Sequence, residues 1–401
     1  MIFMKKKIFI FSHAMEIGGA ERALLGFLDS VDYSKYDIDL FFLKHSGELL
    51  DLIPNEVNLL PEIPQYRAVM LPMVSALKDG QIKVVLGRLV GKIKAKNYSI
   101  KHSAQSSAVA IDYSHKYVVD SLPKINDKNY DCAISFLTPH YIVSKKVNAN
   151  KKIAWIHTDY STIEVDVQSE LQMWSRFDNI VSISDDVTAA FLKKFPELKS
   201  KIVLIENIFS KTFIEEQSNG FDVSNEMPAD SIKLLSIGRF CEAKNFDNVP
   251  EIASLIKAKG IDFKWYIIGY GSDEALIKSK IAEYNISDTV IILGKKDNPY
   301  PYIKACDIYV QPSRYEGKCV AVREAQILDK PAVITNYTTA QSQLNDGFDG
   351  AIVPMDNAGC ANALVDFILD KDKQNQFISN MKTMDYSNQN EVEKIYKIIG
   401  D

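Results

Sequence analysis

Two glutamates, Glu316 and Glu324, stand eight positions apart in the stretch PSRYEGKCVAVREA, which runs over residues 312–325. An apolar run at Ile308–Val310 precedes them and predicts a strand, and a helix is expected over Gly317–Leu328. Eight residues of helix rise about 12 Å. The two carboxylates therefore cannot act on one atom, as a glycosidase pair about 5–10 Å apart does. They could hold two hydroxyl-bearing groups at opposite ends of one ligand.

Backbone amides between these glutamates are a candidate anion site. The amides of Lys318, Cys319 and Val320 lie at the expected helix N-terminus. Free N–H groups and the helix dipole favour a diphosphate at such a position. The alternative is an exposed helix with two ordinary glutamates, and this spacing is common by chance.

A second candidate site follows the apolar run Ile232–Ile237, where the sequence reads GRFCEAKNF from Gly238. Arg239 offers a planar fork of donors and Lys244 a mobile point charge, so the two could clamp a diphosphate. Cations in this role stabilise a leaving diphosphate without a metal. The alternative is a helix start with surface charges.

Two weaker signals lie in the N-terminal half. Gly18 and Gly19 fall between the first expected strand and helix, where glycines let the backbone approach a ligand; the pattern is not G-x-G-x-x-G. His157 ends an expected strand at Ile153–Ile156. From the residues alone, a structural histidine is the more common explanation.

Taken together, these segments resemble glycosyltransferase family 4. The family pattern is P-S-x-x-E-G, a second glutamate at plus eight and a K-P-V strand, and here Glu316, Gly317, Glu324, Lys330 and Pro331 occupy those positions. The G-R-x-x-x-x-K-N-F and G-G-A-E-R segments also have counterparts in the family. The resemblance is densest over residues 232–354.

The resemblance implies roles for individual residues. It implies that Glu316 binds the donor sugar, that Glu324 holds the ribose and that Arg239 and Lys244 hold the diphosphate. It implies that His157 orients the transferred sugar. Gly18 and Gly19 would contact the diphosphate or acceptor, and Gly294 with Lys295 would lie beside the base. Lys318, Cys319 and Arg323 depart from the usual family residues and leave the donor sugar open.

The elements that must position these residues alternate along the chain. Strands are expected at 7–11, 38–43, 57–60, 132–136, 153–156, 180–183, 202–205, 232–237, 263–268, 290–293, 308–310, 332–334 and 350–353, with helical stretches between several of them. This alternation favours parallel sheets with helical crossovers. The expected fold is α/β of the GT-B type, with two Rossmann-like parallel-sheet domains facing across a cleft.

The chain length of 401 residues favours two domains. A polar stretch at 209–230 predicts an interdomain linker between an acceptor-binding domain at 1–208 and a nucleotide-sugar-binding domain at 231–385. The last stretch, 386–401, is expected to form a helix, with packing on the N-terminal domain left open.

Composition excludes some functions. The net charge of -5 argues against a nucleic-acid partner, and five cysteines without a C-x-x-C spacing favour a reducing cytosol over a disulfide framework. The sequence has no apolar run of about 18 residues, so no membrane-spanning segment is predicted. Asp37 and Asp39 form a D-x-D pattern, but they start an apolar strand; no metal or other cofactor is expected.

One segment departs from the alternation. Residues 78–101 hold seven Lys or Arg residues and one acidic residue, Asp79, with apolar residues at helical spacing. One interpretation is a basic amphipathic helix on an anionic membrane surface. The other is an ordinary helix packed on the sheet with a solvated basic face.

The resemblance to glycosyltransferase family 4 implies a retaining hexosyltransferase that moves a sugar from a nucleotide diphosphate sugar, with UDP favoured. The acceptor would be a saccharide or a lipid-linked saccharide in cell-surface polysaccharide or glycolipid synthesis. The protein is expected in the cytoplasm, with peripheral membrane contact left open. The alternatives are a nucleotide-sugar epimerase or hydrolase on the same fold, a non-catalytic GT-B partner subunit, and a two-lobed binding protein.

Overall fold

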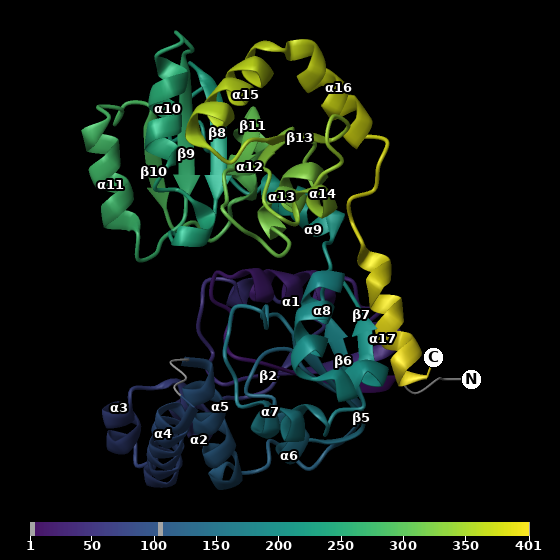
Figure 1. Cartoon of the computed structure of the whole chain (residues 1–401). Helices are drawn as coiled ribbons and strands as arrows, with labels where there is room; N and C mark the ends of the chain where they lie inside the picture. The colour runs from purple at the N-terminus through teal and green to yellow at the C-terminus, as the bar shows by residue number, and fades with distance from the viewer. Residues whose placement is uncertain (1–4, 103–106, 401) are drawn as a thin grey trace. The chain divides into compact units, whose positions relative to one another are not determined.

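The structure is a computed structural model that describes residues 5–102 and 107–400 (Figure 1). The chain divides into two compact units. The first comprises Met1–Ile208 together with Gln389–Asp401, and the second comprises Phe209–Asn388. Among the described residues, no helix combines the length and the apolar character needed to cross a bilayer.

The N-terminal unit is built on a seven-stranded parallel sheet in the order β3-β2-β1-β4-β5-β6-β7. The strands are nearly continuous apolar runs, as expected for a parallel sheet covered on both faces. They span Lys6–Ser12 (β1), Tyr36–Phe42 (β2), Asn58–Leu59 (β3), Asn129–Ser135 (β4), Asn148–Ile156 (β5), Asn179–Ser182 (β6) and Ile202–Leu204 (β7).

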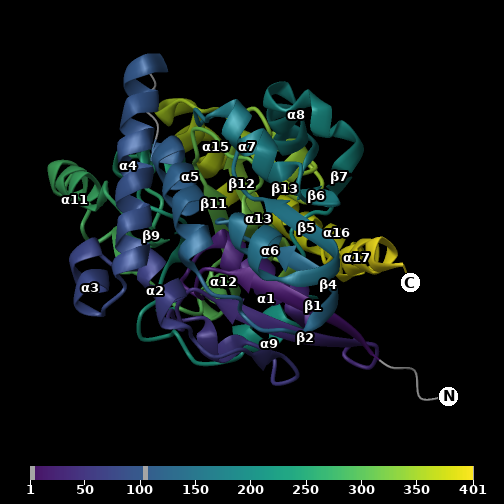
Figure 2. The same ribbon diagram turned by 90° about the horizontal axis from the view of Figure 1, so that it is seen from below.

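Helices connect these strands and lie around the sheet (Figures 1 and 2). They span Gly19–Asp29 (α1), Pro64–Met70 (α2), Met73–Lys78 (α3), Ile82–His102 (α4), Ser107–Val118 (α5), Tyr141–Lys146 (α6), Val167–Trp174 (α7) and Asp185–Lys194 (α8), with short 3₁₀ turns at Leu50–Leu52, Val119–Ser121 and Pro196–Lys201. Helices α4 and α5 form a helical hairpin in the long connection between β3 and β4, in addition to the alternating strands and helices (Figure 2).

The C-terminal helix α17, Val392–Ile399, belongs to the N-terminal unit. Its Tyr396 ring stacks on Tyr36 of β2 with ring centroids 4.2 Å apart, and the Tyr396 hydroxyl accepts a hydrogen bond from the Asp32 backbone N–H. Lys394 donates to the carbonyl of Leu204. The helix therefore packs on the first unit although it comes last in the chain.

The C-terminal unit has a six-stranded parallel sheet in the order β10-β9-β8-β11-β12-β13. The strands span Ile232–Ile237 (β8), Phe263–Ile268 (β9), Val290–Gly294 (β10), Ile308–Gln311 (β11), Ala332–Thr335 (β12) and Gly350–Val353 (β13). The helices span Lys211–Ser218 (α9), Val249–Lys257 (α10), Glu274–Glu283 (α11), Tyr300–Ala305 (α12), Val320–Ile327 (α13), Ala340–Gln343 (α14), Asn357–Leu369 (α15) and Lys371–Met381 (α16). Counted within its own sheet, each unit shows the Rossmann order 3-2-1-4-5-6, and the expected parallel α/β architecture is confirmed.

The expected linker at 209–230 is wrong in one respect. The segment belongs to the C-terminal unit and carries α9. Ile214, Val223 and Met227 are buried in that unit's hydrophobic core. The stretch looked like a linker because its polar residues outnumber its apolar ones, but the few apolar residues are enough to anchor it.

Candidate active site

The two strongest sequence motifs meet at the middle of the C-terminal sheet. One follows β8 and the other follows β11, and these strands are paired neighbours, with Ile308 opposite Leu234. The strand order reverses between them, and open α/β sheets bind ligands at the carboxyl ends of such strands. The fold thus brings Lys244 and Glu316 together across 72 positions of sequence.

Lys244 and Glu316 form an ion pair with an Nζ–Oε1 distance of 2.5 Å. Their side chains are 18% and 11% exposed, so water screens the pair only partly. Burial lowers the pKa of Lys244, but the neighbouring Cys319 and Glu316 raise it more, and the net pKa lies above the ordinary value. Burial raises the pKa of the Cys319 thiol to about 11, so this thiol is neutral at pH 7. The ammonium is fixed where negative charge would gather.

A buried chain of hydrogen bonds fixes the Glu316 carboxylate. The Tyr309 hydroxyl donates to Gln311 Oε1 at 2.7 Å, and Gln311 Nε2 donates to Ser313 Oγ at 2.8 Å. Ser313 Oγ in turn donates to Glu316 Oε1 at 2.7 Å. Because Gln311 and Ser313 are fully buried, this chain positions one oxygen of Glu316 and leaves Oε2 for a ligand.

Polar contacts also tie the two motif loops together. Arg314 makes two 2.8 Å hydrogen bonds to the Asp247 carboxylate, and its backbone N–H donates to the carbonyl of Ala243. Asn245, in the left-handed region at φ 59°, donates from Nδ2 to the carbonyl of Pro312 at 2.8 Å. These contacts fix the position of the loop that carries Lys244 relative to the loop that carries Glu316. A missed signal was the asparagine itself, since this residue type tolerates positive φ in turns.

The helix expected over 317–328 begins later, at Val320. Glu316 and Gly317 therefore lie in a loop, and Gly317 is exposed with open space where a side chain would stand. The expected 12 Å helical separation of Glu316 from Glu324 was wrong, because only the last five residues of that interval are helical. The loop lets Glu316 fold back toward Lys244.

Glu324 lies on α13 and is 1% exposed. Its Oε1 accepts a hydrogen bond from the Tyr300 hydroxyl at 2.9 Å. The Glu324 carboxylate is thus buried inside the C-terminal unit. A ribose could reach it only after a small displacement of its neighbours.

Of the three backbone amides expected to bind a diphosphate, the amide of Cys319 already donates a hydrogen bond within the protein. The Cys319 backbone N–H donates to Gln343 Oε1 of α14 at 2.7 Å, whereas the half-buried Lys318 and Val320 flank it at the start of α13. A diphosphate would therefore compete with Gln343 for this amide. Nothing local in the sequence of α14 marks Gln343 as a partner of residue 319, so this contact could not be predicted.

Arg239 is exposed, and no hydrogen bond or ion pair to another described residue engages it. It follows Gly238, over which the Lys244 stem lies: a Cβ on that glycine would stand 3.1 Å from Lys244 Cδ and Cε. The backbone N–H of Gly269 donates to the carbonyl of Gly294, and Lys295 Nζ lies 5.2 Å from the centre of the Tyr270 ring. Gly238 and Lys295 thus lie on loops and Gly294 is the last residue of β10, so all three are at the carboxyl ends of strands of this sheet.

In the N-terminal unit, His157 follows β5 and packs on the Phe136 ring at 4.7 Å. Its Nε2 is buried, and none of the described residues forms a hydrogen bond with it. Burial lowers the pKa of His157 to about 3, so the ring is neutral at pH 7. It borders a cavity of about 60 Å³ that His140, Thr158 and Tyr160 also line. A neutral ring with a free nitrogen can bind a hydroxyl but cannot act as a cation.

Gly18 and Gly19 form the start of α1, with Gly18 extended at φ −159°. A Cβ on Gly18 would lie 2.1 Å from the Glu21 carboxylate, so this carboxylate folds over the helix N-terminus. The position expected to attract an anion is thus next to a negative charge. A diphosphate there would require Glu21 to move.

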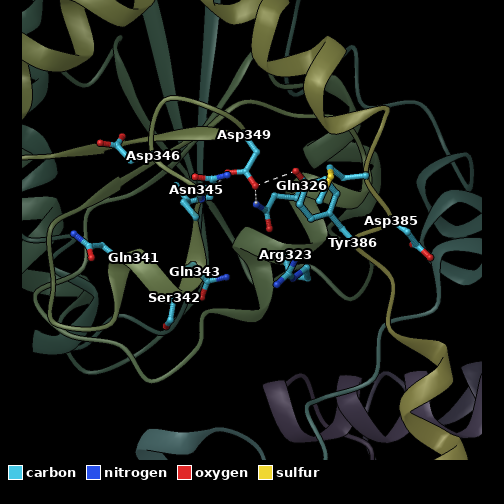
Figure 3. Close-up of a pocket in the computed structure, with 12 residues that line it drawn as sticks. Arg323, Gln326, Gln341, Ser342, Gln343, Asn345, Asp346, Asp349, Asp385 and Tyr386 are labelled. Atoms are coloured by element: carbon cyan, nitrogen blue, oxygen red, sulfur yellow. Dashed lines mark hydrogen bonds between the residues drawn. The ribbon is translucent and has the colours of Figure 1, made fainter.

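A cavity of about 560 Å³ lies on another side of α13 (Figure 3). Asp349 accepts hydrogen bonds from Gln326 and Tyr386 there, and the Arg323 guanidinium lies 5.5 Å from the Tyr386 ring centre. Neither Glu316 nor Lys244 lines it. Arg323, which departs from the family pattern, therefore packs at this cavity.

The D-x-D pattern has another use. Asp39 accepts hydrogen bonds from Asn58, Lys128 and Tyr130, and Asp37 is exposed beside Lys5. Asp37 is the second and Asp39 the fourth of the 7 residues of β2, so neither lies at the carboxyl edge of the sheet. Over residues 5–102 and 107–400, no cluster of three metal-ligating side chains occurs.

Buried neutral histidines should make the N-terminal unit sensitive to acid. His140 is 3% exposed, and burial, with neighbouring histidines, lowers its pKa to about 3. Between about pH 6.5 and 3 the unfolded chain binds a proton that the folded chain does not, so falling pH favours unfolding. From pH 7 to about pH 5 this one group should remove about 2 kcal/mol of stability.

Urea unfolding followed by the fluorescence of Trp174, whose ring centre lies 4.6 Å from that of His140, measures this effect at the two pH values. The variant His140→Asn can keep the hydrogen bond with Ser135 and removes the titrating group. Its pH dependence should be smaller by that amount. An unchanged pH dependence would contradict the assignment.

Part of the chain is similar to known glycosyltransferases. Residues 220–384 match the family model described as glycosyl transferases group 1. The putative glycosyltransferase EpsF of Bacillus subtilis is 30% identical over 111 residues, which cover 28% of this chain and 29% of EpsF. The amylovoran biosynthesis glycosyltransferase AmsK of Erwinia amylovora is 28% identical over 142 residues, which cover 33% of this chain and 35% of AmsK. The chain thus spans about a third of the length of these relatives.

The crystal structure of Anabaena HepE in complex with UDP and glucose superimposes with a TM-score of 0.68 at 14% identity, and it covers 98% of this chain and 99% of HepE. This likeness shows the fold. The chain has the GT-B fold, with two Rossmann-like parallel-sheet units, and the match to the glycosyl transferases group 1 model lies within its C-terminal unit. The expected fold class is confirmed.

Proposed function

We propose that this protein is a retaining glycosyltransferase, of the family 4 type, that transfers a sugar from a nucleotide diphosphate sugar to a saccharide or lipid-linked acceptor. The observation that carries the proposal is the half-buried Lys244–Glu316 ion pair at the point where the strand order of the C-terminal sheet reverses. A cation and a positioned carboxylate at that point suit a donor whose diphosphate leaves with negative charge.

The proposed roles follow the geometry of the C-terminal unit. Arg239 is exposed and free to swing onto the diphosphate, while Lys244 lies deeper and stabilises the charge that develops on the leaving oxygen. The free Oε2 of Glu316 binds sugar hydroxyls, and Glu324 binds the ribose from beneath. No metal is invoked, because the two cations supply the charge.

Supporting observations for the donor class come from relatives. HepE was crystallised with UDP and glucose, and AmsK takes part in amylovoran biosynthesis. We therefore favour a UDP-sugar donor and an acceptor in cell-surface polysaccharide or glycolipid synthesis. On the N-terminal unit, the neutral His157 ring is proposed as a hydrogen-bonding partner for a ligand hydroxyl. The protein would work in the cytoplasm, at a membrane surface when its acceptor is lipid-linked.

Nucleotide binding tests the donor site without knowledge of the acceptor. The thermal unfolding of the purified protein is measured with UDP, GDP, ADP and CDP in parallel. A nucleotide at about 100 times its dissociation constant should stabilise the protein by about 2.7 kcal/mol. We expect UDP to give the largest shift.

The control variants separate a specific site from general anion binding. Arg239→Ala and Glu324→Ala should each reduce the shift, whereas Lys278→Ala, an exposed lysine of α11, should leave it intact. Glu324→Ala is read together with its own unfolding temperature, because that residue is buried. No shift with any nucleotide would overturn the donor-site assignment and favour a non-catalytic subunit.

A further inference from the structure

Helix α4, Ile82–His102, presents different chemistry on different faces. One face is buried against the rest of the N-terminal unit and includes Val84, Val85, Gly91 and Ala95. The residues of the opposite face are exposed. An amphipathic helix of a globular protein normally buries its widest apolar face, so the arrangement here requires an explanation.

Close packing of α4 on α5 explains which face is buried. A Cβ on Gly87 would lie 2.8 Å from the carbonyl oxygen of Tyr117, and a Cβ on Gly91 would lie 2.6 Å from that of Tyr113. With Ala95, these residues form a strip of small side chains at every fourth position, which lets the two helix backbones approach. Apart from these small residues the buried face holds only Val84 and Val85 as large apolar residues, and the other large apolar residues of the helix are exposed.

The remaining large apolar residues form a continuous exposed stripe. Along α4 they recur at intervals of three, four and seven residues and fall within an arc of about 100° around the helix axis. Their exposed fractions are 57% for Ile82, 56% for Leu86, 40% for Leu89, 43% for Val90, 60% for Ile93 and 70% for Ile100. Val74 and Leu77 of the adjacent α3 are also exposed, at 68% and 51%.

Lysines border this stripe on both sides. Lys83, Lys94 and Lys101 lie along one edge, and Lys92 and Lys96 lie along the other. The helix contains no Asp or Glu. Arg88 is different: it donates to the carbonyls of Ala68 and Leu71 and serves the internal packing of the unit. Five exposed cations thus frame an apolar band with no compensating carboxylate on the helix.

From this arrangement we propose that α4, with the exposed residues of α3, docks the protein in the plane of an anionic lipid bilayer surface. The apolar stripe enters the boundary between headgroups and acyl chains, and the two lysine rows pair with anionic headgroups. A soluble protein partner would need a complementary apolar groove and acidic rims, whereas a bilayer offers both an apolar interior and a charged surface along the whole 21-residue helix.

This inference does not rest on the proposed transferase activity, because membrane binding is measured without a donor or acceptor. For the segment 78–101 the two interpretations from sequence were a membrane-binding amphipathic helix and an ordinary packed helix with a solvated basic face. The helix packs on the unit through Val84, Val85, Gly91 and Ala95 and keeps its lysines exposed, and it also leaves a stripe of large apolar residues exposed. Vesicle binding decides between the two interpretations.

Vesicle co-sedimentation of the full chain tests the proposal. The vesicles are phosphatidylcholine alone, or phosphatidylcholine with phosphatidylglycerol, in low and high salt. We expect binding to the anionic vesicles to be at least about 100-fold tighter and to weaken in high salt. The variant Leu86→Ser with Ile93→Ser should lose at least about 10-fold in affinity because it removes apolar burial. The variant Lys83→Gln, Lys94→Gln and Lys101→Gln should lose about 100-fold, at about 5-fold per lysine.

Matched controls lie on the other unit. Leu276→Ser with Leu369→Ser removes leucines that are 45% and 65% exposed, and Lys259→Gln, Lys278→Gln and Lys373→Gln remove three exposed lysines. These variants should bind vesicles like the wild type. Equal loss in control and stripe variants, or equal binding to neutral and anionic vesicles, would overturn the proposal.

A second copy of the chain is the other occupant that the test can reveal. Light scattering in the absence of vesicles measures the oligomeric state of the wild type and of the stripe variant. A dimer that dissociates on Leu86→Ser and Ile93→Ser, together with no vesicle binding, would assign the stripe to self-association and overturn membrane docking.

Discussion

Replacing Glu316 with glutamine should lower the rate of sugar transfer by at least about 100- to 1,000-fold, the usual effect of removing one positioned charge-stabilising group. The substitution keeps the size of the side chain and its hydrogen bonds to Ser313 and Lys244, so the loop geometry is preserved. What disappears is the negative charge near the reacting sugar. The rate of nucleotide release from the donor that thermal unfolding identifies, with and without a saccharide acceptor, measures the effect.

The same variant should still bind the nucleotide. Arg239 and Glu324 are the proposed contacts to diphosphate and ribose, and neither is changed. A thermal shift with the nucleotide that matches the wild type, together with lost turnover, separates chemistry from binding. Glu274→Gln, on exposed α11, is the matched carboxylate control and should keep full activity. Wild-type turnover in Glu316→Gln would remove this residue from the mechanism.

Replacing Lys244 with methionine should have two effects. It removes the cation that would stabilise the departing diphosphate, so turnover should fall about 100- to 1,000-fold. It also leaves the Glu316 carboxylate, only 11% exposed, without its charged partner. Because the pair retains some solvent contact, we expect a loss of about 2 kcal/mol rather than the larger penalty of a fully buried pair. Such a loss corresponds to a fall in Tm of about 4–8 °C for a unit of this size.

A double variant distinguishes these effects. Lys244→Met with Glu316→Gln removes both charges, so it should recover most of the lost stability while remaining inactive. Lys257→Met, which breaks an exposed ion pair with Asp288, should leave both stability and turnover nearly unchanged. If the double variant is as unstable as the sum of the single variants, the 2.5 Å contact does not contribute as described.

Much of the fold could be predicted from local sequence. The buried strands are runs of apolar residues, and their positions agree with the expected ones to within a few residues; β8, β9 and β13 agree at both ends. Parallel strands covered on both faces must be apolar along their length, so this signal is strong. Helix starts were less certain, and α13 begins three residues later than expected because Gly317 and its neighbours fold as a loop.

The candidate site could be predicted by residue type but not by geometry. Lys244 and Glu316 were expected to touch different parts of a donor, and the structure shows that they touch each other. Ser313, Asn245 and Gln343 were not singled out, because each acts through a contact to a residue distant in sequence or to a backbone group. Contacts of this kind depend on which strands become neighbours.

By itself the sequence determined the two parallel sheets, the chemistry of the motif loops and the amphipathic character of residues 78–101. These are local properties, set by hydrophobic periodicity and side-chain type. Only the tertiary structure decided that Glu316 is held by a buried hydrogen-bond chain, and that the large apolar residues of α4 face outward. The physical reason is that a side chain is buried only when another element packs against it, and which elements pack together is decided by the tertiary structure. Small residues at Gly87 and Gly91 took the place against α5, and the stripe was left exposed.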